Sequence, residues 1–317
     1  FSAHRHRLLL GWTRMLDGQL NRAAGGVAAL AGVELHRRDA LWFCALSTGI
    51  ARRAGDSGAL QRHWYAAMEV LAEYSMDLYS LLPLGELWIA AARMRLVDRL
   101  EQHLHEALHL LDTLGRPPLW SVPLHWAGVH AGILANSPDA VAPHGQALTA
   151  AAADSAYARA LARAGRSWLR VLATQVDVDD VTLAARGLAQ FGLTWDATRL
   201  ASQAALQTAD PRVSGVMLQL ARDLKSDTAD SADTPDAYDD PTRAPAALAR
   251  PAATPSARLS DREREVAELL LLGMPYRDIG SRLFISAKTV EHHVARIRRR
   301  LGAESRSEML SMLRALA

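Results

Sequence analysis

A short run near the end of the chain, SAKTVEHHVARIRRRLG at residues 286–302, holds side chains suited to binding an anionic polymer. It contains five Lys or Arg residues and two adjacent histidines. Apolar residues recur in it at Val290, Val294, Ile297 and Leu301. On a helix with about 100° per residue, these four fall within about 60° of one another. The run therefore predicts a helix with one buried seam and a basic outer face.

The faces of this helix suit different partners. The outer face, nearly opposite the seam, holds Lys288, His292, Ala295 and Arg299. It is flanked on one side by Glu291 and Arg298 and on the other by Arg296. Nearer the edge of the core lie Thr289, His293 and Arg300. Basic side chains bind phosphates of any sequence, whereas groove-facing side chains read base edges. The pattern indicates a helix that lies in a groove of duplex DNA while its seam packs on a core.

Three outer positions suit particular bases. Arg299 can pair with guanine, Glu291 can accept from the amino group of cytosine, and Ala295 is small enough to meet the methyl group of thymine. We predict DNA contacts from Lys288, Thr289, Glu291, His292, His293, Ala295, Arg296, Arg299 and Arg300. Thr289 and His293 serve equally well as packing residues, and the alternative for the whole run is a solvated amphipathic helix.

Three further short helices are expected to position the basic one. Ser260 and Glu263 form a capping box for the first, which buries Val266, Leu269 and Leu270 and closes at Gly273. The second spans about 276–283 with Ile279 and Leu283 on one side, and Ser286 caps the basic third helix. SRSEMLSMLRAL supplies a fourth. Two short helices joined by a tight turn, the second basic, form the helix-turn-helix arrangement.

The same stretch resembles the LuxR-type helix-turn-helix module. The matching positions are Leu259, Ser260, Arg262, Glu263, Val266, Gly273, Ile279, Leu283, Ile285, Ser286, Thr289, Val290, His293, Leu301, Gly302 and Arg306. The resemblance implies groove contacts from 291, 292 and 295, and phosphate contacts around Thr289, His293 and the basic end of the helix. Two departures are Glu291, where many members have Lys, and Pro275-Tyr276, where Ser-Asn is usual.

The fourth helix has Met309, Met312 and Leu316 on one side. These residues form either an internal lid or a dimer face. The resemblance favours the dimer face, with two copies bound to paired half-sites on DNA.

Residues 226–257 differ in composition from both neighbours. They hold five of the 13 prolines and six Asp against two Arg, whereas residues 258–317 hold 12 Lys or Arg against eight Asp or Glu. Such a segment buries too little apolar surface to offset the entropy of ordering. We predict a disordered Asp/Pro/Ala linker over 226–257 between a first domain, 1–225, and a DNA-binding domain, 258–317.

The first 225 residues predict helix after helix, with Gly, Pro or Asp clusters between apolar segments. One helical pair per 35 to 45 residues suggests a helical-repeat domain, although a non-repeating bundle is the alternative. GLTWDATRLASQAAL at 192–206 resembles the last tetratricopeptide-like repeat of large LuxR-family regulators. In those regulators a nucleotide-binding module precedes the repeats. The chain has no Gly-Lys-Ser/Thr phosphate loop and starts at Phe1, so we expect a carboxy-terminal part without ATP hydrolysis.

The sequence thus predicts an all-α, non-enzymatic transcription regulator of the cytoplasm and nucleoid, without cofactor or membrane segment. Its partners are double-stranded DNA, a second copy on DNA, and a protein or small-molecule effector on the helical repeats. His105 and His109, with Glu101 one turn earlier, fit a wet helix face better than a metal site. The alternative functions are an interaction scaffold whose basic end docks an acidic partner, and a sigma-like promoter-recognition factor.

Overall fold

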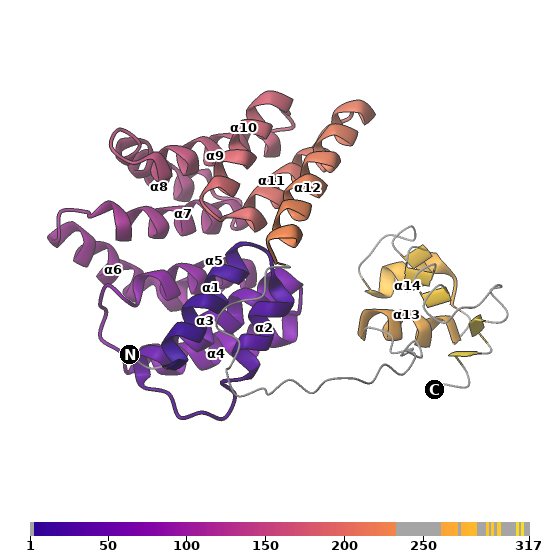
Figure 1. Ribbon diagram of the computed structural model, residues 1–317, viewed down its shortest axis with the longest axis horizontal. Coiled ribbons are helices and arrows are strands. Elements are labelled where there is room, and N and C mark those ends of the chain that lie inside the picture. The colour runs from indigo at the N-terminus through magenta and orange to yellow at the C-terminus, as the bar shows by residue number, and fades with distance from the viewer. Residues whose placement is uncertain are drawn as a thin grey trace, which may run out of the picture. The chain divides into compact units, whose positions relative to one another are not determined.

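The computed structural model describes residues 3–232, 261–271, 274–283, 290, 291, 293, 294, 297, 298, 309, 310, 312 and 313. The chain divides into two compact units, Phe1–Asp239 and Asp240–Ala317. Every regular element in the described part of both units is a helix, as the sequence predicts (Figure 1). Within the described ranges, no helix has the length and apolar character needed to cross a membrane.

The first unit consists of twelve α-helices and one 3-10 helix among its described residues. They are α1 (Ala3–Leu16), α2 (Leu20–Ala28), α3 (Arg37–Ala54), α4 (Ser57–Ala72), α5 (Leu81–Met94), η1 (Val97–Leu100), α6 (Glu101–Thr113), α7 (Pro118–Leu134), α8 (Pro138–Ala151), α9 (Ala156–Leu172), α10 (Val178–Gln190), α11 (Thr194–Gln207) and α12 (Pro211–Ala232).

Short polar side chains fix where several of these helices begin. Asp56 accepts a hydrogen bond from the amide of Ala59 at 2.9 Å, and Asp177 accepts one from Asp180 at 3.0 Å. These caps satisfy amide donors that have no partner inside the helix. Gly55 follows α3 with φ of 79°, a left-handed conformation that glycine adopts without steric cost.

The odd-numbered helices of this unit form one continuous layer. Helices α1, α3, α5, α7 and α9 each contact the next odd-numbered helix, up to α11. Helices α2, α4, α8, α10 and α12 each contact the odd-numbered helix before them. The odd-numbered helices start 34 to 44 residues apart, which agrees with the predicted spacing of helical pairs. The likeness of these pairs to tetratricopeptide repeats stays a prediction.

This layer of odd-numbered helices closes on itself, which an open repeat array does not do. Helix α1 contacts α11, and Thr194 donates a hydrogen bond of 2.7 Å to Asp17 across 177 residues of sequence. Leu16, at the end of α1, packs against both apolar cores of the unit. The first and last pairs of helices are therefore neighbours, contrary to a solenoid in which each repeat contacts only its sequence neighbours.

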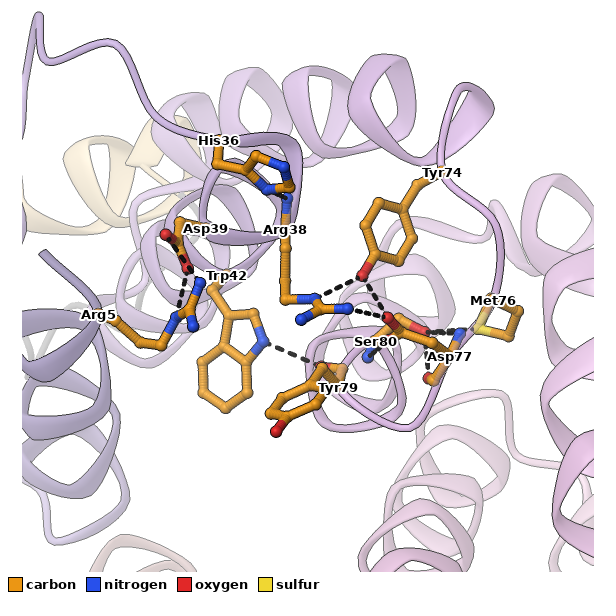
Figure 2. Close-up of polar contacts among 10 residues, drawn as sticks. All are labelled: Arg5, His36, Arg38, Asp39, Trp42, Tyr74, Met76, Asp77, Tyr79 and Ser80. Carbon is orange, nitrogen blue, oxygen red and sulfur yellow. Dashed lines mark hydrogen bonds and ion pairs between the residues drawn. The ribbon is translucent and has the colours of Figure 1, made fainter. Parts of the chain in front are cut away.

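A polar network fastens the loop between α4 and α5 to α3 (Figure 2). Arg38 donates to the Tyr74 hydroxyl at 3.1 Å and to Asp77 at 2.8 Å, and its guanidinium lies 4.6 Å from the centre of the Tyr79 ring. Trp42 donates to the carbonyl of Tyr79 at 2.9 Å. The loop is thus held by side chains of one helix rather than by apolar packing alone.

The predicted linker starts too early. Helix α12 continues to Ala232, so 226–232 belong to a helix and not to a linker. The segment Ser-Asp-Thr-Ala-Asp-Ser-Ala contains neither Gly nor Pro, and extending an existing helix costs far less than starting one. The rest of the predicted linker, 233–257, lies outside the described residues.

Glu101, His105 and His109 are exposed on α6. In the part of the chain that the structure describes, no group of three or more His, Cys, Asp or Glu residues is placed to hold a metal ion.

Candidate nucleic-acid interface

The second unit has an apolar core built from the segments that the sequence assigned to it. Helix α13 spans Asp261–Leu271 and α14 spans Tyr276–Leu283, the second with the predicted bounds. Val266, Leu269 and Leu270 of α13 are buried, and so is Ile279 of α14. All four belong to one cluster. The predicted cap at Ser260 and the predicted stop at Gly273 lie outside the described residues.

Pro275 directly precedes α14 and stands in place of a side-chain cap. Its carbonyl accepts hydrogen bonds from the amides of Asp278 at 2.9 Å and Ile279 at 3.0 Å. A proline loses nothing at this position because the first amides of a helix have no partner within it. The amide of Met274 in turn donates to the carbonyl of Leu269 at 3.2 Å, which links the end of α13 to the start of α14.

The described positions of the basic run confirm its predicted seam. Val290 and Ile297 are fully buried and Val294 is nearly so, all in the core that also holds α13 and α14. Glu291 and Arg298, at about 90° from the seam on a helix, are exposed. Leu301, the fourth seam residue, lies outside the described residues.

His293 is half-buried, as its predicted place at the edge of the core requires. Together these positions fix the rotation of the basic run about its own axis.

Of the nine predicted DNA contacts, the structure describes Glu291 and His293. The other seven, Lys288, Thr289, His292, Ala295, Arg296, Arg299 and Arg300, lie outside the described residues. Arg298 is exposed beside Glu291 and was not among the nine. Its helical position, on the same flank as Glu291, is the sequence signal that includes it among the basic residues of the outer side.

Met309 is not part of an exposed dimer face. It is fully buried in the core of the second unit, together with Leu313. The two residues are four positions apart, so they lie on one side of a helix and both turn inward. Met312 is 36% exposed and remains available to a partner, and Leu316 lies outside the described residues.

Comparisons with known proteins concern this second unit. Residues 257–313 match the family described as bacterial regulatory proteins, luxR family. The spore germination protein GerE of Bacillus subtilis (strain 168) is 46% identical over 50 residues, which is 16% of this chain and 68% of that protein. No solved structure matches the chain. The buried seam, the two supporting helices and this identity agree: the chain belongs to the LuxR family of bacterial regulatory proteins, through a helix-turn-helix DNA-binding domain at its carboxyl end.

Proposed function

We propose that this chain is a sequence-specific transcription regulator whose basic run, 286–302, lies in the major groove of DNA. The observation that carries the proposal is the burial of Val290, Val294 and Ile297 beside exposed Glu291 and Arg298. A helix held by that seam turns its opposite face away from the core. The side chains at about 180° from the seam are Lys288, His292, Ala295 and Arg299.

Affinity and sequence choice come from different residues in this arrangement. We assign Arg296 and Arg300 to the phosphates along the groove walls, and binding of this kind releases counterions whatever the sequence. We assign Arg299 and Ala295 to base edges. Exposed Glu291 accepts but does not donate hydrogen bonds, so it favours a cytosine amino group and disfavours a nearby phosphate.

The salt dependence of DNA binding tests this proposal against an acidic-partner scaffold. Fluorescence anisotropy with fragments selected from genomic DNA is expected to give an affinity that falls steeply with salt, by a log–log slope of about 0.9 per phosphate contacted. The double substitution Arg296→Ala/Arg299→Ala should lower affinity at least tenfold and reduce that slope by about one. Arg186→Ala, an exposed arginine on α10, is the matched control and should change neither.

Affinity that is insensitive to salt, or a double variant that binds as tightly as the wild type, would refute this use of the basic run. Mapping bound sites across the genome with the same two variants extends the test to the cell. The control should keep the wild-type sites and the double variant should lose them.

We also propose that two copies pair on DNA, with Met312 at the contact, and that the first unit receives the controlling signal. Exposure of Met312 beside the inward-facing Met309 and Leu313 supports the first point. The regular spacing of the helical pairs supports the second, because domains built from such pairs commonly bind partners. A regulator of bacterial promoters acts in the cytoplasm on the nucleoid.

The likeness of 192–206 to the last repeat of large LuxR-family regulators supports a relation of this chain to their carboxy-terminal part. Sedimentation of the chain with and without a selected DNA site tests pairing. Two chains per site are expected, and Met312→Asp should reduce this to one.

A further inference from the structure

A groove opens where the layer of odd-numbered helices closes. Its volume is about 620 Å³, and it is bordered by the turn between α1 and α2, the end of α3, one side of α11 and Lys225 of α12. Small-molecule sites typically measure about 300 to 1,000 Å³. Its charged, aromatic and hydroxyl-bearing lining includes Asp17, Arg53, Trp195, Thr198, Arg199 and Lys225.

The groove has more positive than negative charge. Arg53, Arg199 and Lys225 line it, and Asp17 is the acidic residue among its lining. The Asp17 carboxylate already accepts hydrogen bonds from Thr194 at 2.7 Å and from Gln19 at 2.8 Å. Arg199 and Lys225 are exposed, and neither forms an ion pair with any residue that the structure describes. Two positive charges are therefore left over.

Arg53 is a buried cation near two buried carboxylates, Glu86 and Asp196, and it shares the first of them with another arginine. Its side chain is 3% exposed, and one of its terminal nitrogens donates to Glu86 Oε1 at 2.9 Å. Arg52 donates to the same oxygen at 2.8 Å, so two buried guanidinium groups share one carboxylate. Arg53 Nε is buried without a hydrogen-bond partner among the described residues. Such a donor can be satisfied by an acceptor that the described residues do not provide, such as a water molecule or a ligand oxygen.

A second buried donor belongs to the lining of the same groove. Thr198 is 8% exposed, it lines the same groove, and its hydroxyl has no hydrogen-bond partner within the described part of the chain. A hydroxyl and a guanidinium N–H are both groups that bind the oxygen atoms of an anion.

Trp195 holds the arginines in place. The guanidinium carbons of Arg53, Arg52 and Arg199 lie 4.9, 5.3 and 5.3 Å from the centre of its ring. The negative face of an indole attracts cations at such distances. Together with Glu86, which bridges Arg52 and Arg53, and with nearby Asp196, the indole keeps the three guanidinium groups close together. Three arginines against two carboxylates leave the cluster with an excess of positive charge, which favours a ligand of opposite charge.

We propose that this groove binds a small molecule with at least two negative charges, carried on phosphate or carboxylate groups. Arg199 and Lys225 bind the charged groups from the open side, and Arg53 and Thr198 donate from the closed side. This inference rests on the proposed signal-receiving role of the first unit and gives the chemical class of the signal.

Isothermal titration of the full 317-residue chain with sodium pyrophosphate and, separately, with sodium citrate tests the groove. Ionic strength is kept constant with sodium chloride. We expect saturable binding of at least one probe at one site per chain, and the preferred probe distinguishes phosphate from carboxylate chemistry. Arg199→Ala/Lys225→Ala, which alters two exposed side chains, should weaken binding at least tenfold, and Arg186→Ala should stay within twofold of wild type.

The inference is overturned if neither probe binds at millimolar concentration, or if the double variant binds as tightly as the wild type. DNA binding of the same proteins separates this outcome from the proposed function. Unchanged DNA affinity in the double variant supports a dedicated small-anion site. A loss of DNA affinity in that variant would overturn it, since the groove would then bind the DNA backbone. Anion binding by a chain that fails to bind DNA would leave the groove standing and refute the regulator.

Discussion

Replacing Glu86 by Gln is expected to destabilise the first unit strongly. The side chains of Glu86, Arg52 and Arg53 are each 3 to 6% exposed, and one carboxylate oxygen accepts hydrogen bonds from both arginines. A glutamine removes the one charged group that accepts hydrogen bonds from both buried guanidinium groups. Removing one partner of a buried ion pair typically costs about 3 to 5 kcal/mol.

The pKa of Glu86 leads to a similar magnitude. Burial opposes ionisation and would raise this pKa, but Arg52 and Arg53 outweigh burial and lower it from 4.5 to about 2. One pKa unit corresponds to about 1.4 kcal/mol, so ionised Glu86 contributes about 3 kcal/mol. Because the folded-state pKa is depressed, this stability is present above pH 4.5 and is lost as the pH falls towards 2. Wild type and Glu86→Gln should therefore differ most near neutral pH and converge in acid.

Urea unfolding followed by tryptophan fluorescence measures this effect selectively, because all eight tryptophans lie before residue 196. The control is Glu73→Gln, which breaks the exposed pair with Arg37, whose side chains are 66 and 68% exposed. Exposed pairs contribute about 0 to 1 kcal/mol. If Glu86→Gln costs less than about 1 kcal/mol at pH 7, or if its deficit is the same at pH 3 as at pH 7, the account of this cluster is wrong.

Three other substitutions test separate parts of the fold. Gly49→Ala would place a Cβ 2.6 Å from the sulfur of Met15, and it should lower the free energy of unfolding by about 1 to 3 kcal/mol in the same urea assay. The control is Gly145→Ala, whose Cβ meets nothing within 4 Å and which should be neutral or stabilising. Ile297→Ala should remove about 2 to 5 kcal/mol from the second unit, seen as faster amide exchange in α13 together with weaker DNA binding; unchanged exchange would contradict the buried seam. Asp77→Ala removes acceptors of the network in Figure 2 and should speed amide exchange in the loop between α4 and α5 while leaving α9 unchanged.

The second unit could be predicted well because its determinants are local. The helix 276–283 follows from a proline start and a single buried side, and the seam follows from four apolar residues at three- and four-residue spacings. Local signals do not settle which apolar residues stay exposed. Met309 and Met312 are both methionines, three positions apart. Which of them is buried depends on the packing of the other helices against them, and only Met309 is buried.

The first unit could be predicted as pairs of helices, but its closure could not. Turn residues mark where helices end, so the spacing of pairs follows from the sequence. Contact between α1 and α11 depends on the small rotations added at each pair, which no single segment determines. The arginine cluster was missed for the same reason, since Arg53 and Trp195 meet only because the layer closes.

The contact between the first and last helix pairs closes the layer of odd-numbered helices and also brings the positive charges of the groove together. A ligand that bridges Arg53 of α3, Arg199 of α11 and Lys225 of α12 contacts the early and late helix pairs at once. A ligand that binds the closed layer better than any opened form stabilises the closed layer in proportion to that difference in affinity. Helix α12 carries Lys225 and continues to Ala232, from which the chain leads to the DNA-binding unit. The groove therefore includes part of the helix that precedes the segment joining the two units. In the proposed regulator, α12 is the covalent connection between the proposed ligand and the proposed pairing of two DNA-binding domains.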